Sequence, residues 1–151
     1  MTVVSLRFSP PRAGWMAVRL AVDESVLKFD VSDVPNNVIE ELFDAVAATA
    51  AGRGGTVWWH DEPAGYWLEL ATADDDRVRL RLWHREYEAD RPGRELLDIT
   101  GCRRELLLPL WRGLRQFASY SCEASDWTAS FVEDFPLRIL RLRDAIAPRV
   151  R

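Results

Sequence analysis

The stretch TVWWHDEPAGYWLELATADDDRVRLRLWHR, residues 56–85, decides the fold that we expect for this chain. Apolar residues recur in it at every second position, which is the period of a β-strand with one buried face and one wet face. Turn-forming residues interrupt the alternation twice, at 61–65 and at 74–76. The stretch therefore predicts three antiparallel strands joined by short turns.

The alternation also predicts how these strands pair. A loop with an odd number of residues at 74–76 aligns the leucines of the second strand with those of the third, and a slip of one residue would set them opposite arginines. In the preceding hairpin we expect Trp58 to pair with Leu68 and Trp59 with Trp67. The predicted core face then carries Trp58, Tyr66, Leu68, Leu70, Leu80 and Leu82. The opposite face, which we call the Trp/Arg face, carries Trp59, Trp67, Glu69, Arg79, Arg81 and Trp83.

The residues before this stretch repeat the pattern. Segments 2–8, 15–22 and 27–31 alternate in the same way and are separated by short turns, so they predict a second antiparallel meander. The alternation places Arg19 and Lys28 on the wet side of that meander.

A first helix is predicted between the two meanders. Pro35 suits its first turn, and Ser32 or Asp33 could cap it. Its core-facing stripe consists of Val38, Ile39, Leu42, Phe43 and Val46.

The C-terminal third of the chain predicts a loop, a strand and two more helices. The polar segment 90–101 is typical of a loop, and 103–108 is expected to form a strand. Pro109 and Pro136 would then each lie in the first turn of a helix. The stripe expected on the last helix consists of Leu137, Leu140, Leu142 and Ile146.

These elements define an α+β fold. We expect one antiparallel sheet of six or seven strands packed by three helices, in the order β-β-β-α-β-β-β-β-α-α. A length of 151 residues, with 48% hydrophobic and 29% charged residues, fits a single globular domain covering residues 1–151.

The net charge, the cysteines and the lack of targeting signals limit which kinds of protein and which cellular compartments we expect. A net charge of −4 provides no overall field for nucleic acid or an anionic membrane. We find neither a secretory signal nor an apolar run long enough to span a bilayer, so we expect a cytoplasmic protein without membrane association. Cys102 and Cys122 are expected to be reduced thiols. Lys28 is the only lysine among the 20 Lys and Arg residues, which is typical of GC-rich bacterial coding.

Several short motifs together resemble a known group of proteins. They are Val57-Trp58-Trp59, Glu62-Pro63, Gly65-Tyr66-Trp67, Leu108-Pro109-Leu110 and Phe135-Pro136-Leu137. The chain resembles small uncharacterised α+β proteins of GC-rich bacteria, which are similar in architecture to immunity proteins of bacterial toxin systems. Such immunity proteins bind and block one toxin. The resemblance implies a protein partner and transfers no functional residue.

The Trp/Arg face is the first candidate site. Tryptophan and arginine contribute most of the binding energy at many protein interfaces, because each combines a large contact area with directed hydrogen bonds. Two alternatives remain: the later helices could cover this face as a second core layer, or it could bind nucleic acid by stacking bases on Trp67 and Trp83 while Arg79 and Arg81 hold phosphates. The net charge and the central Glu69 argue against nucleic acid.

A pocket near His60, Tyr66 and His84 is the alternative site. In one register these residues form a row across three strands, close to acidic residues that could support acid–base chemistry. The two histidines would lie nearly 10 Å apart, so a shared metal ion is not expected. No nucleophile elbow or phosphate-binding glycine loop is present, and we expect no cofactor.

A third surface is acidic and could contact a basic partner. It would combine Glu40, Glu41, Asp44, Glu123, Asp126, Glu133 and Asp134. Taken together, the sequence predicts a non-enzymatic protein-binding module, and the alternatives are a small-molecule-binding protein or enzyme and a nucleic-acid binder.

Overall fold

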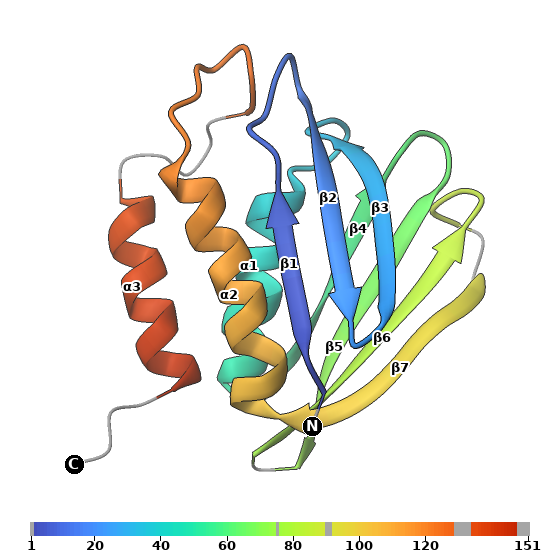
Figure 1. Ribbon diagram of the computed structural model, residues 1–151, viewed down its shortest axis with the longest axis vertical. Coiled ribbons are helices and arrows are strands. Elements are labelled where there is room, and N and C mark those ends of the chain that lie inside the picture. Colours follow the sequence, from blue (N-terminus) through green and yellow to red (C-terminus); the bar gives the residue numbers. More distant parts are fainter. Residues whose placement is uncertain (1, 75, 90–91, 129–133, 148–151) are drawn as a thin grey trace.

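In the computed structural model, which describes residues 2–74, 76–89, 92–128 and 134–147, three strands, a helix, four strands and two helices follow one another along the chain (Figure 1). The strands are β1 (Val4–Phe8), β2 (Trp15–Val22), β3 (Ser25–Ser32), β4 (Gly54–His60), β5 (Gly65–Asp74), β6 (Arg77–Arg85) and β7 (Arg94–Cys102). The helices are α1 (Val38–Ala50), α2 (Arg103–Ser119) and α3 (Phe135–Ile146). The α+β class is thus confirmed.

The prediction of one continuous sheet is wrong. The strands form a first sheet with the order β1-β2-β3 and a second sheet with the order β4-β5-β6-β7, and every pairing is antiparallel. Helix α1 connects the two sheets and packs against β4, and ring contacts between the sheets show that the meanders pack face to face rather than edge to edge. Aromatic rings join their inner faces: Phe8 of β1 and Phe29 of β3 both lie 6.0 Å from Trp59 of β4, between ring centroids.

Each sheet is flanked by a helix at very close range. A Cβ atom added to Gly55 in β4 would come within 2.6 Å of Ala45 in α1, and one added to Gly113 in α2 would come within 2.9 Å of Leu6 in β1. Only glycine permits the approach at Gly55, where the neighbouring atom belongs to the backbone of Ala45, whereas at Gly113 the Leu6 side chain would have to move. Helix α3 packs on α2, where the Trp111 indole donates a hydrogen bond of 2.7 Å to the carbonyl of Ile139.

The structure corrects several element boundaries. Asn37 caps α1, because its side chain accepts hydrogen bonds from the amides of Ile39 and Glu40. The segment predicted as a loop contains β7, and the segment predicted as a strand, 103–108, is the first part of α2. Burial of the leucine stripe of α2 outweighs the cost of a proline inside a helix, about 3 kcal/mol.

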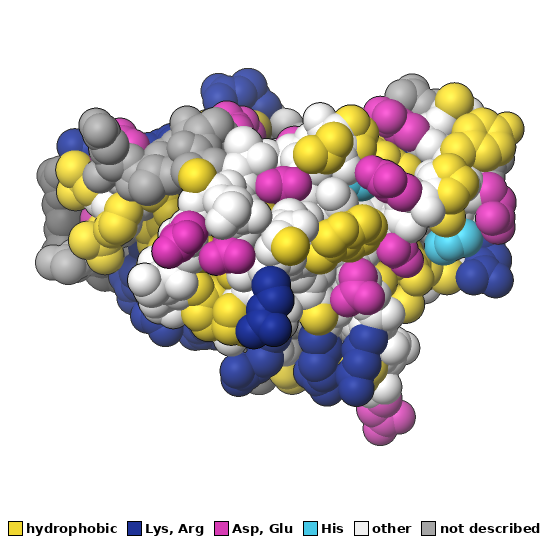
Figure 2. Space-filling model, turned by 90° about the horizontal axis from the view of Figure 1, so that it is seen from above, with side chains coloured by type: hydrophobic (Ala, Val, Ile, Leu, Met, Phe, Trp, Pro, Cys, Tyr) yellow, Lys and Arg dark blue, Asp and Glu magenta, His cyan; other side chains and the backbone are white. Residues whose placement is uncertain are grey.

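The last helix presents a different stripe from the predicted one. Leu137 and Leu140 are 49% and 60% exposed, whereas Phe135 and Ile139 are buried together with the predicted Leu142 and Ile146. Among the described residues, none of the helices has both the length and the apolar character needed to cross a bilayer. Figure 2 shows the molecule from above, where several Lys and Arg side chains gather at the lower edge, others lie at the remaining edges, and Asp and Glu are spread over the middle.

Candidate functional site

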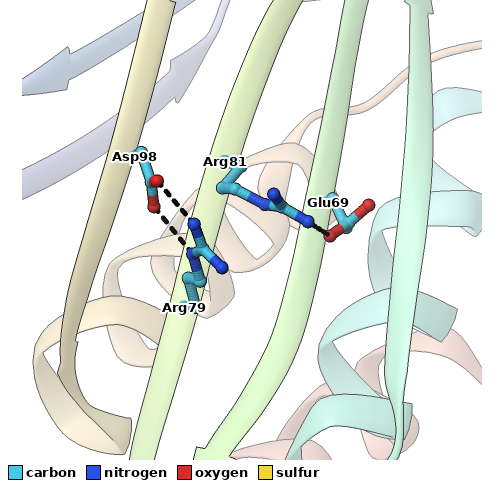
Figure 3. A network of polar contacts seen from close by, with 4 residues as sticks. All are labelled: Glu69, Arg79, Arg81 and Asp98. Atoms are coloured by element: carbon cyan, nitrogen blue, oxygen red, sulfur yellow. Dashed lines mark hydrogen bonds and ion pairs between the residues drawn. The ribbon is translucent and has the colours of Figure 1, made fainter. Parts of the chain in front are cut away.

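A ladder of two ion pairs crosses the outer face of the second sheet (Figure 3). Arg79 on β6 binds Asp98 on β7 through two hydrogen bonds, Nε to Oδ1 at 2.8 Å and a terminal nitrogen to Oδ2 at 2.6 Å. Arg81, two residues further along β6, binds Glu69 on β5 at 2.5 Å. The register makes this possible, because Glu69 pairs directly with Arg81 and Leu68 with Leu82. The predicted pairing of β5 with β6 is therefore confirmed.

Aromatic rings lie beside these guanidinium groups. The Arg81 guanidinium lies 4.9 Å from the centroid of the Trp83 ring, and the Arg85 guanidinium lies 4.3 Å from the Trp67 ring. At such distances the ring quadrupole attracts the cation. The arginines are thus held by carboxylates, by aromatic rings, or by both.

The predicted place of Trp59 on this face is wrong. Trp59 pairs with Tyr66 and points into the core, where it is only 2% exposed, while Trp58 pairs with Trp67 and takes the outer position. The hairpin has a loop of four residues, 61–64, instead of the expected five, and this moves every side chain of β4 to the other face. Gly65 allows the shorter loop, because a Cβ atom there would lie 2.3 Å from the carbonyl oxygen of Trp59.

The outer face is neither fully open nor a closed second core. Trp58 and Trp83 are 5% and 8% exposed, so most of the predicted aromatic surface is unavailable to a partner. The carbonyls of Glu88 and Pro92 accept hydrogen bonds from Arg85, so the segment after β6 closes one end of the face. The ion-pair ladder remains open to solvent.

The alternative pocket does not assemble. Tyr66 and His84 are neighbours on the inner face of the sheet, with ring centroids 5.3 Å apart, but His60 points to the outer face. The same shift in register is the reason, because it places Trp59 rather than His60 beside Tyr66. His60 is 2% exposed, and its Nε2 lies 3.4 Å from the carbonyl oxygen of Asn36.

A polar cluster at the edge of β4 is absent from the predicted sites. Glu41 of α1 accepts a hydrogen bond of 3.0 Å from the amide of Trp58, and Asn36 donates one of 3.0 Å to the carbonyl of the same residue. These side chains satisfy an edge strand that has no neighbouring strand on that side. Burial raises the pKa of Glu41, and the hydrogen bonds from Trp58 and Asn36 partly oppose this effect. The Glu41 carboxylate is therefore engaged within the fold and is not free to act in the predicted acidic surface.

The residues predicted to form one acidic surface are also engaged in different parts of the fold. Glu41 is engaged in this cluster, and Asp126 helps to attach the 120–128 segment, since its carbonyl accepts a hydrogen bond of 2.8 Å from the amide of Gly14. Glu133 lies outside the described residues. The buried Trp127 of the same segment, which the sequence did not mark, donates to the side chain of Asn37 at 3.1 Å.

Electrostatics at the ladder agree with its geometry. The hydrogen bond from Arg79 lowers the pKa of Asp98, and the same contact raises the pKa of Arg79. Within the described ranges, no group of three or more His, Cys, Asp or Glu residues could hold a metal ion. The site therefore offers fixed charges and aromatic contact area.

Comparison of the chain with protein-family models, curated proteins and solved structures finds no match.

Proposed function

We propose that this chain is a non-enzymatic protein-binding module that contacts one protein partner through the outer face of the second sheet. The observation that carries the proposal is the ladder formed by Glu69, Arg81, Arg79 and Asp98. Its side chains remain 29% to 43% exposed although each one is fixed by an ion pair. They can therefore touch a partner without being ordered by it.

Preorganisation gives this ladder its value in binding. A free arginine side chain carries about 2 kcal/mol of rotamer entropy, part of which is lost when an interface forms. Arg79 is already held by two hydrogen bonds to one carboxylate, so less entropy is lost on association. Because both guanidinium groups are paired with carboxylates, the face suits a partner with mixed charges better than the phosphates of nucleic acid.

The type of partner follows from the resemblance and the charge. A small acidic α+β chain with a net charge of −4 fits an immunity-type inhibitor that blocks a bacterial toxin by occlusion. In this proposal the ladder fixes the orientation of the complex, and Trp67, which is half-buried beneath Arg85, adds apolar contact area.

Capture of the partner from the native cells, with a charge-reversed bait as comparison, tests the proposal. The wild-type chain should retain one protein that Arg81→Glu does not retain, because reversal places two carboxylates opposite each other and removes the guanidinium from the face. The captured protein should then inhibit growth when it is expressed alone, and co-expression of the wild-type chain should restore growth.

A double exchange provides the control. Glu69→Arg combined with Arg81→Glu keeps an ion pair between the same two positions while reversing its direction, so the fold is retained and the contact is altered. Circular dichroism should show all variants folded. The proposal fails if Arg81→Glu retains the same protein as the wild type, or if the captured protein has no effect on growth that the chain suppresses.

A further inference from the structure

A row of cations crosses the outer face of the first sheet, on the side of the molecule away from the ion-pair ladder. Arg7 on β1 pairs directly with Arg19 on β2, and Arg19 pairs directly with Lys28 on β3. All three side chains are exposed. Their Cβ atoms lie about 5 Å apart, as in any directly opposed pair on neighbouring strands.

The row continues onto α2. A groove of about 550 Å³ lies along the seam between β1 and this helix, and Arg7, Arg112, Arg115 and Gln116 are among the residues that line it. A second hollow of about 400 Å³ on the sheet shares Arg7 and Gln116 with the groove and extends to Arg19 and Lys28. The two hollows form one surface, which we call the basic groove, and its five cations are Arg7, Arg19, Lys28, Arg112 and Arg115.

The basic groove is electrostatically unbalanced within an acidic protein. In the part of the chain that the structure describes, none of its five cations forms an ion pair with a carboxylate. Like charges placed directly opposite each other on a sheet destabilise it, so the row of Arg7, Arg19 and Lys28 opposes folding. On the second sheet, by contrast, each arginine of the ladder has a carboxylate beside it.

We propose that the basic groove binds an extended acidic segment of a protein partner. Carboxylates on alternate residues of an extended chain lie about 7 Å apart on one side, a spacing that cations on adjacent strands can match. The arginine fork binds a carboxylate through two parallel hydrogen bonds. Ala17 lies beside Arg19 on the same face of β2, and its small, exposed side chain leaves room for the backbone of a bound segment.

Two observations favour an acidic polypeptide over nucleic acid. The residues directly between the cations on the outer face are small or acidic, such as Ser5, Ala17 and Asp30. The exposed Trp15 of the same face lies four residues from Arg19 at the start of β2, so no aromatic ring stands between the cations for base stacking. The net charge of −4 also opposes a long polyanion, whereas a short acidic segment interacts only within the screening length of about 8–10 Å. This inference concerns a different face from the proposed function and does not depend on it.

Binding of a labelled peptide of alternating glutamate and serine, measured by fluorescence anisotropy at low salt, tests the inference. The wild-type chain should bind this peptide, and it should not bind a peptide with glutamine in place of glutamate. Arg19→Glu should weaken binding about tenfold or more, because a like charge is then placed in the middle of the groove. Arg141→Glu is the matched control, since it makes the same change of charge at an exposed position of α3, and it should leave binding unchanged.

Stability provides an independent readout. Arg19→Glu replaces two repulsive cross-strand pairs by two attractive ones, so the melting temperature of the free protein should rise by about 2–4 °C. The inference is overturned if the two variants bind the glutamate peptide equally, or if the wild type does not bind it. It is likewise overturned if oligothymidylate of equal charge binds more tightly, or if Arg19→Glu lowers the melting temperature.

Discussion

Replacing Trp59 by alanine should destabilise this protein more than replacing Trp67, although the sequence predicts that the two residues share a face. Trp59 is 2% exposed, and its ring contacts Phe8 and Phe29 from the other sheet. Burying a tryptophan removes about 150–250 Å² from water, which corresponds to about 4–6 kcal/mol at about 25 cal/mol per Å². Measured losses for Trp→Ala in cores are about 3–5 kcal/mol. We therefore expect Trp59→Ala to lower the free energy of unfolding by about 4 kcal/mol.

The expected loss for Trp67→Ala is smaller. Trp67 lies half-buried on the outer face, and its ring contacts the guanidinium of Arg85. On the same scale of about 4 kcal/mol for a fully buried ring, about half of the apolar contribution, or about 2 kcal/mol, and a cation–π contribution of about 0.5–1 kcal/mol are lost, which together give about 2.5–3 kcal/mol. Urea unfolding followed by far-ultraviolet circular dichroism measures both values on one scale. Since about 1 kcal/mol shifts the melting temperature of a chain of this size by about 2–4 °C, the two variants should differ by several degrees.

The control is a substitution that keeps an aromatic ring. Trp59→Phe retains contact with Phe8 and Phe29, so it should cost clearly less than the alanine variant. If Trp67→Ala proves as destabilising as Trp59→Ala at equal denaturant slopes, then Trp59 does not face the core, and β4 does not pair with β5 in the register that sets Trp59 opposite Tyr66.

Three further measurements test the polar cluster, the tight hairpin and the ladder. Burial raises the pKa of Glu41 above 4.5, so the native state holds its proton more tightly than the unfolded chain. Stability should therefore fall as pH rises from 4.5 through the raised native value, and Glu41→Gln should remove that decline; an unchanged pH profile would contradict this assignment. Gly65→Ala should destabilise by about 2 kcal/mol or more, since its Cβ would lie 2.3 Å from the Trp59 carbonyl oxygen, and a neutral effect in thermal melts would disprove the close approach. A double-mutant cycle on Glu69 and Arg81 should give a coupling of about 0.5–1 kcal/mol that weakens in high salt, whereas a value that does not depend on salt would rule out an ion pair as its source.

The alternation of apolar residues predicted the faces of most strands. In the first sheet the predicted inward residues, such as Leu6, Val18 and Phe29, are buried, and Arg19 and Lys28 point outward. The pairing of β5 with β6 followed from the same signal, because a slip would have buried arginines. Burial of apolar area is a large term that acts along a whole strand, and this makes such predictions robust.

The pairing of β4 with β5 was not predictable in the same way. Both registers place a tryptophan on each face, since Trp58 and Trp59 are adjacent, so the hydrophobic pattern cannot distinguish them. One residue in the turn decides between the two registers, because Gly65 is the first residue of β5 and pairs with His60. The candidate site therefore differs from the predicted one: Trp58 instead of Trp59 lies on the outer face, and His60 lies on the opposite face from Tyr66.

Two other errors came from local signals that tertiary packing overrode. Pro109 suggested a helix start, but the helix begins at Arg103 because the leucines on both sides of the proline share one buried stripe. Asp98 lay in the segment assigned to a loop, so the partner of Arg79 was not recognised. The sequence did contain a signal for this strand, because the apolar Leu97 and Ile99 flank Asp98 in strand alternation. In the structure Leu97 pairs with Leu82 of β6 and Ile99 pairs with Leu80.

The two outer faces use the same residue type in opposite ways. On the second sheet each arginine of the ladder is matched by a carboxylate, so its charge is neutralised locally; in the proposed function it contributes direction and shape to a contact. On the first sheet the cations lie opposite one another, so their mutual repulsion lowers the stability of the fold. Their positive potential attracts an acidic group that approaches within the screening length. Unmatched charges act mainly on the rate of association, and fixed, partly desolvated pairs act mainly on the lifetime of a complex. If both faces contact one partner, the basic groove would control how fast the complex forms and the ladder how long it persists, which explains why a small acidic chain would retain a destabilising row of cations.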